Sequence, residues 1–171
     1  FLVIGTYAMQ LAFMRHFNQH LPADGVVVEN ISDQLSGLAI AGPEAQNIMS
    51  QVTDAPMDSD AFLFLDAKQI RFHGGQNVIA LRVSYTGETG YELYMAPADQ
   101  PAVFDQLRAN EHEEQRLALC GLRTLMMLRL EKSYPAWGLE ITSDYYAHEC
   151  GLMNHVKCDK GDFIGRSAVM N

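Results

Sequence analysis

Alternating side-chain character predicts two short strands joined by a turn near the middle of the chain. Residues 78–85 (VIALRVSY) are rich in β-branched and apolar residues and follow a strand-like pattern. Residues 86–90 (TGETG) contain two glycines, which readily adopt the positive φ angles of tight turns. Residues 91–95 (YELYM) then resume the strand pattern. The sequence therefore predicts a β-hairpin over residues 78–95.

The second of these strands carries a carboxylate between large apolar neighbours. Because successive side chains of a strand point to opposite faces, Glu92 and Tyr94 share one face. An ionised group buried alone is very costly, so Glu92 must be solvated, paired or used in binding. Together with Tyr85 across the turn, it could offer one acidic acceptor and aromatic surface to a flat ligand. A hairpin whose glutamate simply faces water is the alternative, and the pattern leaves both open.

The same patterning predicts an α+β fold. The first 55 residues show the order β-α-β-β-α, with strands at 1–5, 26–29 and 38–41 and helices at 8–20 and 45–52. This order is the core of a ferredoxin-like unit. Short strands follow within residues 61–95, and helices at 97–109 and 117–128. We therefore expect a ferredoxin-like lobe at 1–55 and a β-rich lobe with helices at 56–171.

The helix expected at 117–128 is strongly apolar, and its exit is rich in charged and aromatic residues. Met126 and Met127 are expected to fill the core with the neighbouring leucines, because methionine fills irregular gaps readily. Residues 128–138 then concentrate Arg129, Glu131, Lys132, Tyr134 and the only tryptophan, Trp137. Such residues suit a pocket rim, although Arg129 and Lys132 can equally complement the negative end of the helix. Both interpretations stay open.

Composition narrows the class of protein. A chain of 171 residues with 48% hydrophobic content can bury a substantial core, and no apolar run approaches the roughly 20 residues of a membrane helix. The 12 basic against 21 acidic residues give a formal charge of −9, which argues against a nucleic-acid partner. Three cysteines without a CxxC pair fit a reducing compartment, so we expect the cytoplasm or an organelle matrix.

Familiar catalytic and metal-binding motifs do not occur. The cluster of His148, Cys150, His155 and Cys158 has the wrong spacing for common zinc sites, so no metal is expected. The sequence also contains no GxGxxG, GxxxxGK[ST], GxSxG or HExxH motif. Any chemistry must therefore rest on a less common arrangement.

Four sequence blocks, in order along nearly the whole chain, resemble the glycine-cleavage T-protein superfamily. They are AGPEA at 41–45, ALRVSYTGETGYELY at 80–94, LRLEKSYPAWGLE at 128–140 and DFIGRSAV at 162–169. The chain is most similar to the folate domain of the dimethylglycine dehydrogenase, dimethylglycine oxidase and sarcosine dehydrogenase branch. In that branch a flavin half oxidises an N-methyl amine. The folate half collects the one-carbon unit as 5,10-methylenetetrahydrofolate.

The resemblance implies which residues hold tetrahydrofolate. Tyr85, Glu92, Leu93 and Tyr94 correspond to the wall that binds the pterin, and Tyr134 corresponds to a further pocket aromatic. The chemistry agrees, because a carboxylate can accept both neighbouring N–H donors of a 2-amino-4-oxopteridine in a charge-assisted fork. The likeness therefore points to the same hairpin as the strand pattern does.

The resemblance also implies parts that these residues do not supply. The family's catalytic aspartate and the FAD-binding domain would lie upstream of residue 1, so we expect a catalytically inactive fragment with the flavin domain of the same polypeptide as partner. The location would be the cytoplasm, or the mitochondrial matrix in a eukaryote. Leu125 stands where aminomethyltransferases carry arginine, and Asn154 stands where the amine dehydrogenases carry tyrosine. A stand-alone aminomethyltransferase of the glycine cleavage system and a non-catalytic folate-binding module are the alternatives.

Overall fold

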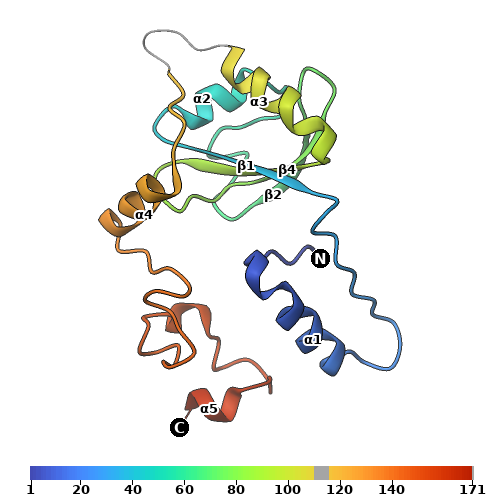
Figure 1. Ribbon diagram of the computed structural model, residues 1–171, viewed down its shortest axis with the longest axis vertical. Helices are drawn as coiled ribbons and strands as arrows, with labels where there is room; N and C mark the ends of the chain where they lie inside the picture. Colours follow the sequence, from blue (N-terminus) through green and yellow to red (C-terminus); the bar gives the residue numbers. More distant parts are fainter. Residues whose placement is uncertain (110–115, 171) are drawn as a thin grey trace.

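A four-stranded antiparallel sheet forms the centre of the computed structural model, which describes residues 1–109 and 116–170 (Figure 1). The strands are β1 (Ser36–Ala41), β2 (Ala67–Arg71), β3 (Asn77–Leu81) and β4 (Gly90–Met95), in the order β1-β4-β3-β2. The α-helices are α1 (Gln10–His20), α2 (Ala45–Ser50), α3 (Gln100–Ala109), α4 (Leu122–Glu131) and α5 (Arg166–Met170). Short 3₁₀ turns lie at Tyr7–Met9, Pro97–Asp99 and Met153–His155. The predicted α+β class is confirmed.

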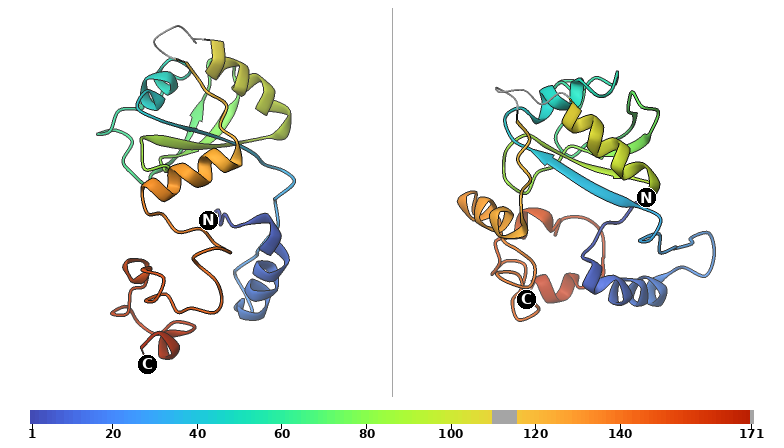
Figure 2. Two further views of the ribbon diagram at one scale, coloured as in Figure 1. Left: turned by 60° about the vertical axis from the view of Figure 1, so that its left-hand side comes forward. Right: turned by 45° about the horizontal axis from the view of Figure 1, so that its top comes forward.

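The two faces of the sheet have different surroundings. Helices α2 and α3 lie over one face, and α1 and α4 lie on the opposite side (Figures 1 and 2). The core is the layer between the sheet and the first pair of helices, where Leu93 and Val103 are fully buried. The second face, which we call the open face, carries half-buried and exposed side chains. Strand β1 and helix α2 from the first 55 residues share this core with the later strands.

The predicted hairpin is confirmed, although its first strand is shorter than expected. Strands β3 and β4 pair in antiparallel fashion, with Ala80 opposite Leu93 and Leu81 opposite Glu92. Strand β3 ends at Leu81, so residues 82–89 form a loop rather than a continuation of the strand. The alternation predicted for residues 91–95 is also correct, because every second side chain is buried.

The strands predicted at residues 1–5 and 26–29 are wrong. Neither segment pairs with a strand among the described residues, so the expected β-α-β-β-α order does not form there. Apolar and β-branched residues favour a strand, but a strand also requires a partner for its backbone groups. Both segments line a cavity beside α1 instead.

The expectation that Met126 and Met127 fill the core is also wrong. Met127 is 62% exposed and Met126 is half-buried, and the only buried side chain of α4 is that of Arg129. Buried hydrophobic residues are confined, in the described chain, to residues 40–107 and Ala136. Helix α4 therefore lies outside the main core. None of the described helices is both long enough and apolar enough to cross a membrane.

Candidate functional site

A hydrogen-bonded carboxylate lies at the centre of the open face. Glu92 stands on β4, half-buried, opposite Ala39 of β1 and Leu81 of β3. The hydroxyl of Tyr94 donates a hydrogen bond of 2.7 Å to Glu92 Oε2. Burial raises the pKa of Tyr94, and the bond to Glu92 raises it further, so the phenol keeps its proton. No described residue donates a hydrogen bond to Glu92 Oε1, which leaves one carboxylate oxygen able to accept from a ligand.

A cavity adjoins this pair on the side of Tyr94. We call it the α1 cavity; its volume is about 510 Å³, and Gly37 and Tyr94 form its floor on the sheet. Its other walls come from α1 and from the two segments that precede and follow it, through Phe1–Tyr7, Gln10, Phe13, Met14, Phe17, Val26–Ser32 and Leu35. The lining is mainly apolar, with Glu29 as its only charged side chain. The volume is in the usual range for small-molecule sites.

A second and smaller hollow lies at the other end of β4. We call it the turn pocket; its volume is about 240 Å³, and its lining is Phe64, Arg82, Val83, Ser84, Gly87, Glu88, Thr89, Gly90 and Tyr134. Gly87 has a φ of +73°, and a side chain there would also meet Lys132. The glycine therefore allows both the turn and the close approach of Lys132.

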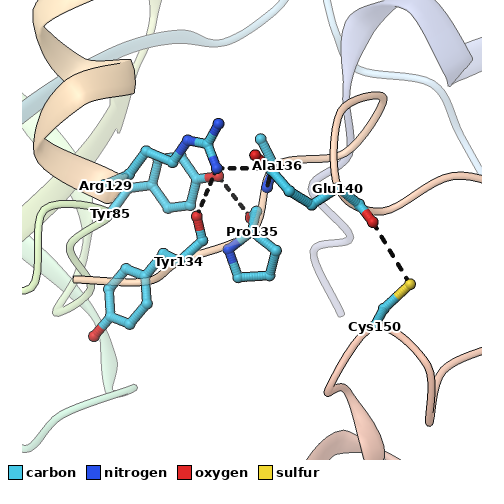
Figure 3. Close-up of polar contacts among 7 residues, drawn as sticks. All are labelled: Tyr85, Arg129, Tyr134, Pro135, Ala136, Glu140 and Cys150. Atoms are coloured by element: carbon cyan, nitrogen blue, oxygen red, sulfur yellow. Dashed lines mark hydrogen bonds and ion pairs between the residues drawn. The ribbon is translucent and has the colours of Figure 1, made fainter. Parts of the chain in front are cut away.

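Tyr85 holds the segment after α4 against this turn. Its hydroxyl donates a hydrogen bond of 2.7 Å to the carbonyl oxygen of Pro135 (Figure 3). Its ring is stacked on that of Tyr134, with centroids 6.3 Å apart and an interplanar angle of 21°. Nearby, Lys132 Nζ lies 3.2 Å from Glu88 Oε1. These contacts fix Tyr134, which is 41% exposed, at the wall of the turn pocket.

Arg129 organises the same segment from the other side. Its guanidinium is 3% exposed, and Nη1 donates to the carbonyl oxygen of Tyr134 and to Glu140 Oε2, at 2.9 and 2.7 Å. Glu140 Oε2 also accepts from the backbone N–H of Ala136 (Figure 3). The hydrogen bond from Arg129, with that from Ala136, lowers the pKa of Glu140 to about 2. Arg129 therefore connects the end of α4 to Tyr134 and Glu140, in addition to any favourable interaction with the negative end of its helix.

The five residues expected to bind folate fall into three places. Glu92 and Tyr94 meet on the open face, and Tyr85 and Tyr134 meet beside the turn pocket. Leu93 is fully buried in the core, so its side chain does not reach the open face. No group of three or more His, Cys, Asp or Glu residues suited to a metal ion occurs within residues 1–109 and 116–170.

Some residues of these hollows were not expected from the sequence. Phe64 lines the turn pocket and is 70% exposed, between Leu63 and Leu65, which are also exposed. A run of three large apolar residues is unusual for an exposed loop. This run is the feature of the sequence that could have indicated a binding surface here. Glu140 carried no such signal, because its partner Arg129 is eleven positions away.

Comparison with known proteins shows similarity to two kinds of enzyme. The family model described as "GCVT N-terminal domain" matches residues 1–160. The mitochondrial dimethylglycine dehydrogenase of Homo sapiens is 36% identical over 99% of the chain, which spans 20% of that protein. The aminomethyltransferase of Halalkalibacterium halodurans is 39% identical over 85% of the chain, and the match covers 39% of that protein. For the aminomethyltransferase of Chloroherpeton thalassium the identity is 36%, over 89% of the chain and 41% of the relative. The chain therefore spans less than half of these relatives.

Proposed function

Because the chain belongs to the GCVT N-terminal domain family, we propose that the open face of its sheet binds the pterin of tetrahydrofolate. In this proposal the chain is the folate-binding, one-carbon-transfer portion of a flavin-dependent N-methyl amine dehydrogenase. The one-carbon unit released from dimethylglycine or sarcosine would be captured there as 5,10-methylenetetrahydrofolate. The flavin domain and its FAD would belong to the same polypeptide, and the family's catalytic aspartate would lie outside these residues.

The observation that supports this proposal best is the carboxylate of Glu92 beside the α1 cavity. A half-buried acid on a sheet face is costly to desolvate unless it is hydrogen-bonded, and Tyr94 satisfies only one of its two oxygens. A pterin edge presents neighbouring N–H donors, which suit the remaining acceptor capacity of a carboxylate. The apolar α1 cavity next to it can exclude water from a bound ring.

The protein's own residues would bind and orient the ligand rather than react with it. Tyr94 keeps its proton because its pKa is raised, so it always donates to Glu92 near neutral pH. That donation fixes the direction of the Glu92 carboxylate. The remaining oxygen is then preorganised for a donor on the ligand. Bound tetrahydrofolate would supply the nitrogen atoms that accept the one-carbon unit.

The assignment to a dehydrogenase rests on the share of the chain that aligns with each relative and on the residue at position 125. The human dimethylglycine dehydrogenase aligns over 99% of the chain, against 85% for the aminomethyltransferase of Halalkalibacterium halodurans. Leu125 stands where the resemblance leads us to expect arginine in an aminomethyltransferase. A matrix location is proposed from the mitochondrial relative, with the cytoplasm as the bacterial equivalent. A stand-alone aminomethyltransferase is the second candidate, since relatives of that name match most of the chain.

Titration calorimetry with tetrahydrofolate on Glu92→Gln tests the folate proposal. Gln has nearly the same shape but carries no charge. One of its two terminal groups is an NH₂ group, which donates hydrogen bonds and therefore cannot accept one from the N–H donors of the ligand. A hydrogen bond to a charged group contributes about 1.5–3 kcal/mol, so we expect the Kd to rise by roughly 10- to 150-fold. Glu44→Gln, an exposed change just before α2 on the other side of the sheet, is the matched control and should leave the Kd unchanged. A Kd for Glu92→Gln within twofold of the parent protein would refute the assignment.

A further inference from the structure

Two histidines lie one helical turn apart on the surface of α1, a helix that stands apart from α2 and α3 (Figure 1). His16 and His20 are four positions apart, and side chains at that spacing share one face of a helix. Their rings have centroids 4.4 Å apart, with an interplanar angle of 40°. Both residues are exposed, and neither lines the α1 cavity. The pair therefore presents two imidazole rings to solvent, on a face that the proposed function does not use.

A hydrogen bond fixes which nitrogen of His20 is free. His20 Nδ1 donates to the carbonyl oxygen of His16 at 2.8 Å, because a carbonyl oxygen can only accept. In the neutral ring the other nitrogen, Nε2, then keeps its lone pair. Histidines that bind metal ions usually donate their second ring N–H to a backbone carbonyl or a carboxylate in this way. Within residues 1–109 and 116–170, no group hydrogen-bonds to the ring of His16, so its nitrogens are also available.

Two imidazole rings at this spacing can chelate a divalent transition metal ion. Zinc binds imidazole nitrogen at about 2.0–2.1 Å, so one ion can join two nitrogens that lie up to about 4 Å apart. Histidines at positions i and i+4 of a helix supply two zinc ligands in known helical metal sites. With centroids 4.4 Å apart, small side-chain rotations bring two ring nitrogens within that reach. Water would fill the other coordination positions, since no group of three or more His, Cys, Asp or Glu residues suits a metal ion in the described chain.

The electrostatics of α1 favour a cation at the same place. His20 is the last residue of the helix, where the unpaired carbonyl groups carry partial negative charge. Apart from the two histidines, Arg15 is the only ionisable side chain of α1, and adjacent positions such as 15 and 16 do not face each other. The whole chain has a formal charge of −9, so its field attracts cations.

We propose that His16 and His20 together bind a divalent transition metal ion of the kind that imidazole ligands prefer, such as Zn²⁺. Helix α1 has 11 residues, none of them buried, and a helix this short is only marginally stable without packing. An ion held by both rings joins consecutive turns, so it stabilises the end of α1 that carries Phe17 of the α1 cavity. The site needs no residue of the folate proposal, so either can fail without the other.

Titration calorimetry with zinc chloride on the whole 171-residue chain tests this proposal. Loss of an outer-shell partner alone costs about 10–100-fold in metal affinity, so His16→Gln and His20→Gln should each raise the Kd for zinc at least roughly tenfold. The matched control is Asn18→His/His20→Gln, which keeps the number of histidines but places them two positions apart, on different faces of the helix. It should bind zinc as weakly as His20→Gln does. His155→Gln, a change of an exposed histidine elsewhere, should leave the Kd within twofold of the parent protein.

Hydrogen exchange shows where the ion binds. Zinc should slow the exchange of the α1 amides near His20 in the parent protein, and it should leave them unchanged in Asn18→His/His20→Gln. Unchanged α1 exchange in the parent protein at a zinc concentration that saturates the calorimetric signal would overturn the proposal, as would the absence of any zinc binding. Tight binding by the spacing variant would also overturn it, because the shared helix face would then play no role. So would a loss in His155→Gln equal to that in His16→Gln, which would place the ion near the C-terminal cysteines instead.

Discussion

Removing one hydroxyl should loosen the segment after α4. In Tyr85→Phe the ring remains for stacking on Tyr134, but the hydrogen bond of 2.7 Å to the Pro135 carbonyl is lost. Because both groups are part-buried, the loss combines the net value of a hydrogen bond with the cost of an unsatisfied carbonyl, about 1–2 kcal/mol. That energy corresponds to roughly a 5- to 30-fold increase in the population of the opened segment.

Native-state hydrogen exchange measures this population directly. The backbone N–H of Tyr134 donates to the carbonyl oxygen of Arg129 at 2.9 Å, and that of Ala136 donates to Glu140 Oε2 at 2.9 Å. Both amides should lose protection by the same factor in Tyr85→Phe. Trp137, the only tryptophan, lies in the segment and reports its mobility through fluorescence anisotropy. Core amides in β4 should exchange as in the parent protein.

A second tyrosine provides the control. Tyr7 is 77% exposed, so Tyr7→Phe should change neither the exchange of Ala136 nor the anisotropy of Trp137. The reasoning is refuted if Tyr85→Phe leaves the protection of both amides within twofold of the parent protein. The stacked rings and the Lys132–Glu88 ion pair would then be sufficient to hold the segment.

Two further predictions concern stability. The pKa of Glu140 is lowered from 4.5 to about 2 by its bonds to Arg129 and Ala136, so its stabilising effect is complete above pH 4.5 and is lost as the pH falls towards 2. The stability difference between the parent protein and Glu140→Gln, from thermal melts at several pH values, should therefore shrink across that window; a constant difference would contradict the prediction. Met49→Ala should cost about 2–5 kcal/mol in urea unfolding, because Met49 is fully buried, whereas Met127→Ala should change stability by less than about 0.5 kcal/mol. Similar losses for the two variants would show that α4 packs more tightly than its exposure indicates.

Local periodicity was sufficient to predict the hairpin but not its surroundings. The alternation at residues 91–95 placed Glu92 and Tyr94 on one face, and the burial pattern of β4 confirms it. A strand prediction at residues 1–5 or 26–29 needed knowledge of a pairing partner, which side-chain pattern does not contain. The prediction for Met127 failed for a related reason, because the apolar character of a helix does not show whether that helix packs against the core.

Contacts between distant residues explain the rest of what the sequence did not predict. The bond from Tyr85 to Pro135 joins residues 50 positions apart, so the local sequence pattern could not predict this structural contact. The strand pattern placed Glu92 on the face opposite Tyr91 and Leu93, but it left open whether the carboxylate faces water, and the structure shows it half-buried. Its hydrogen bond to Tyr94 joins side chains two positions apart on one face, which the period of a strand brings together.

The core face of β4 determines where the candidate site can be. Tyr91, Leu93 and Met95 are no more than 1% exposed, and burial of each such side chain contributes about 1.5–3 kcal/mol. Shifting the strand by one residue would expose these three and force Glu92 into the core, where an unpaired charge is very unfavourable. The position of the carboxylate is therefore maintained by the packing behind it, with no need for support from the ligand. This is why a substitution such as Glu92→Gln, on the open face, can test binding without disturbing the fold.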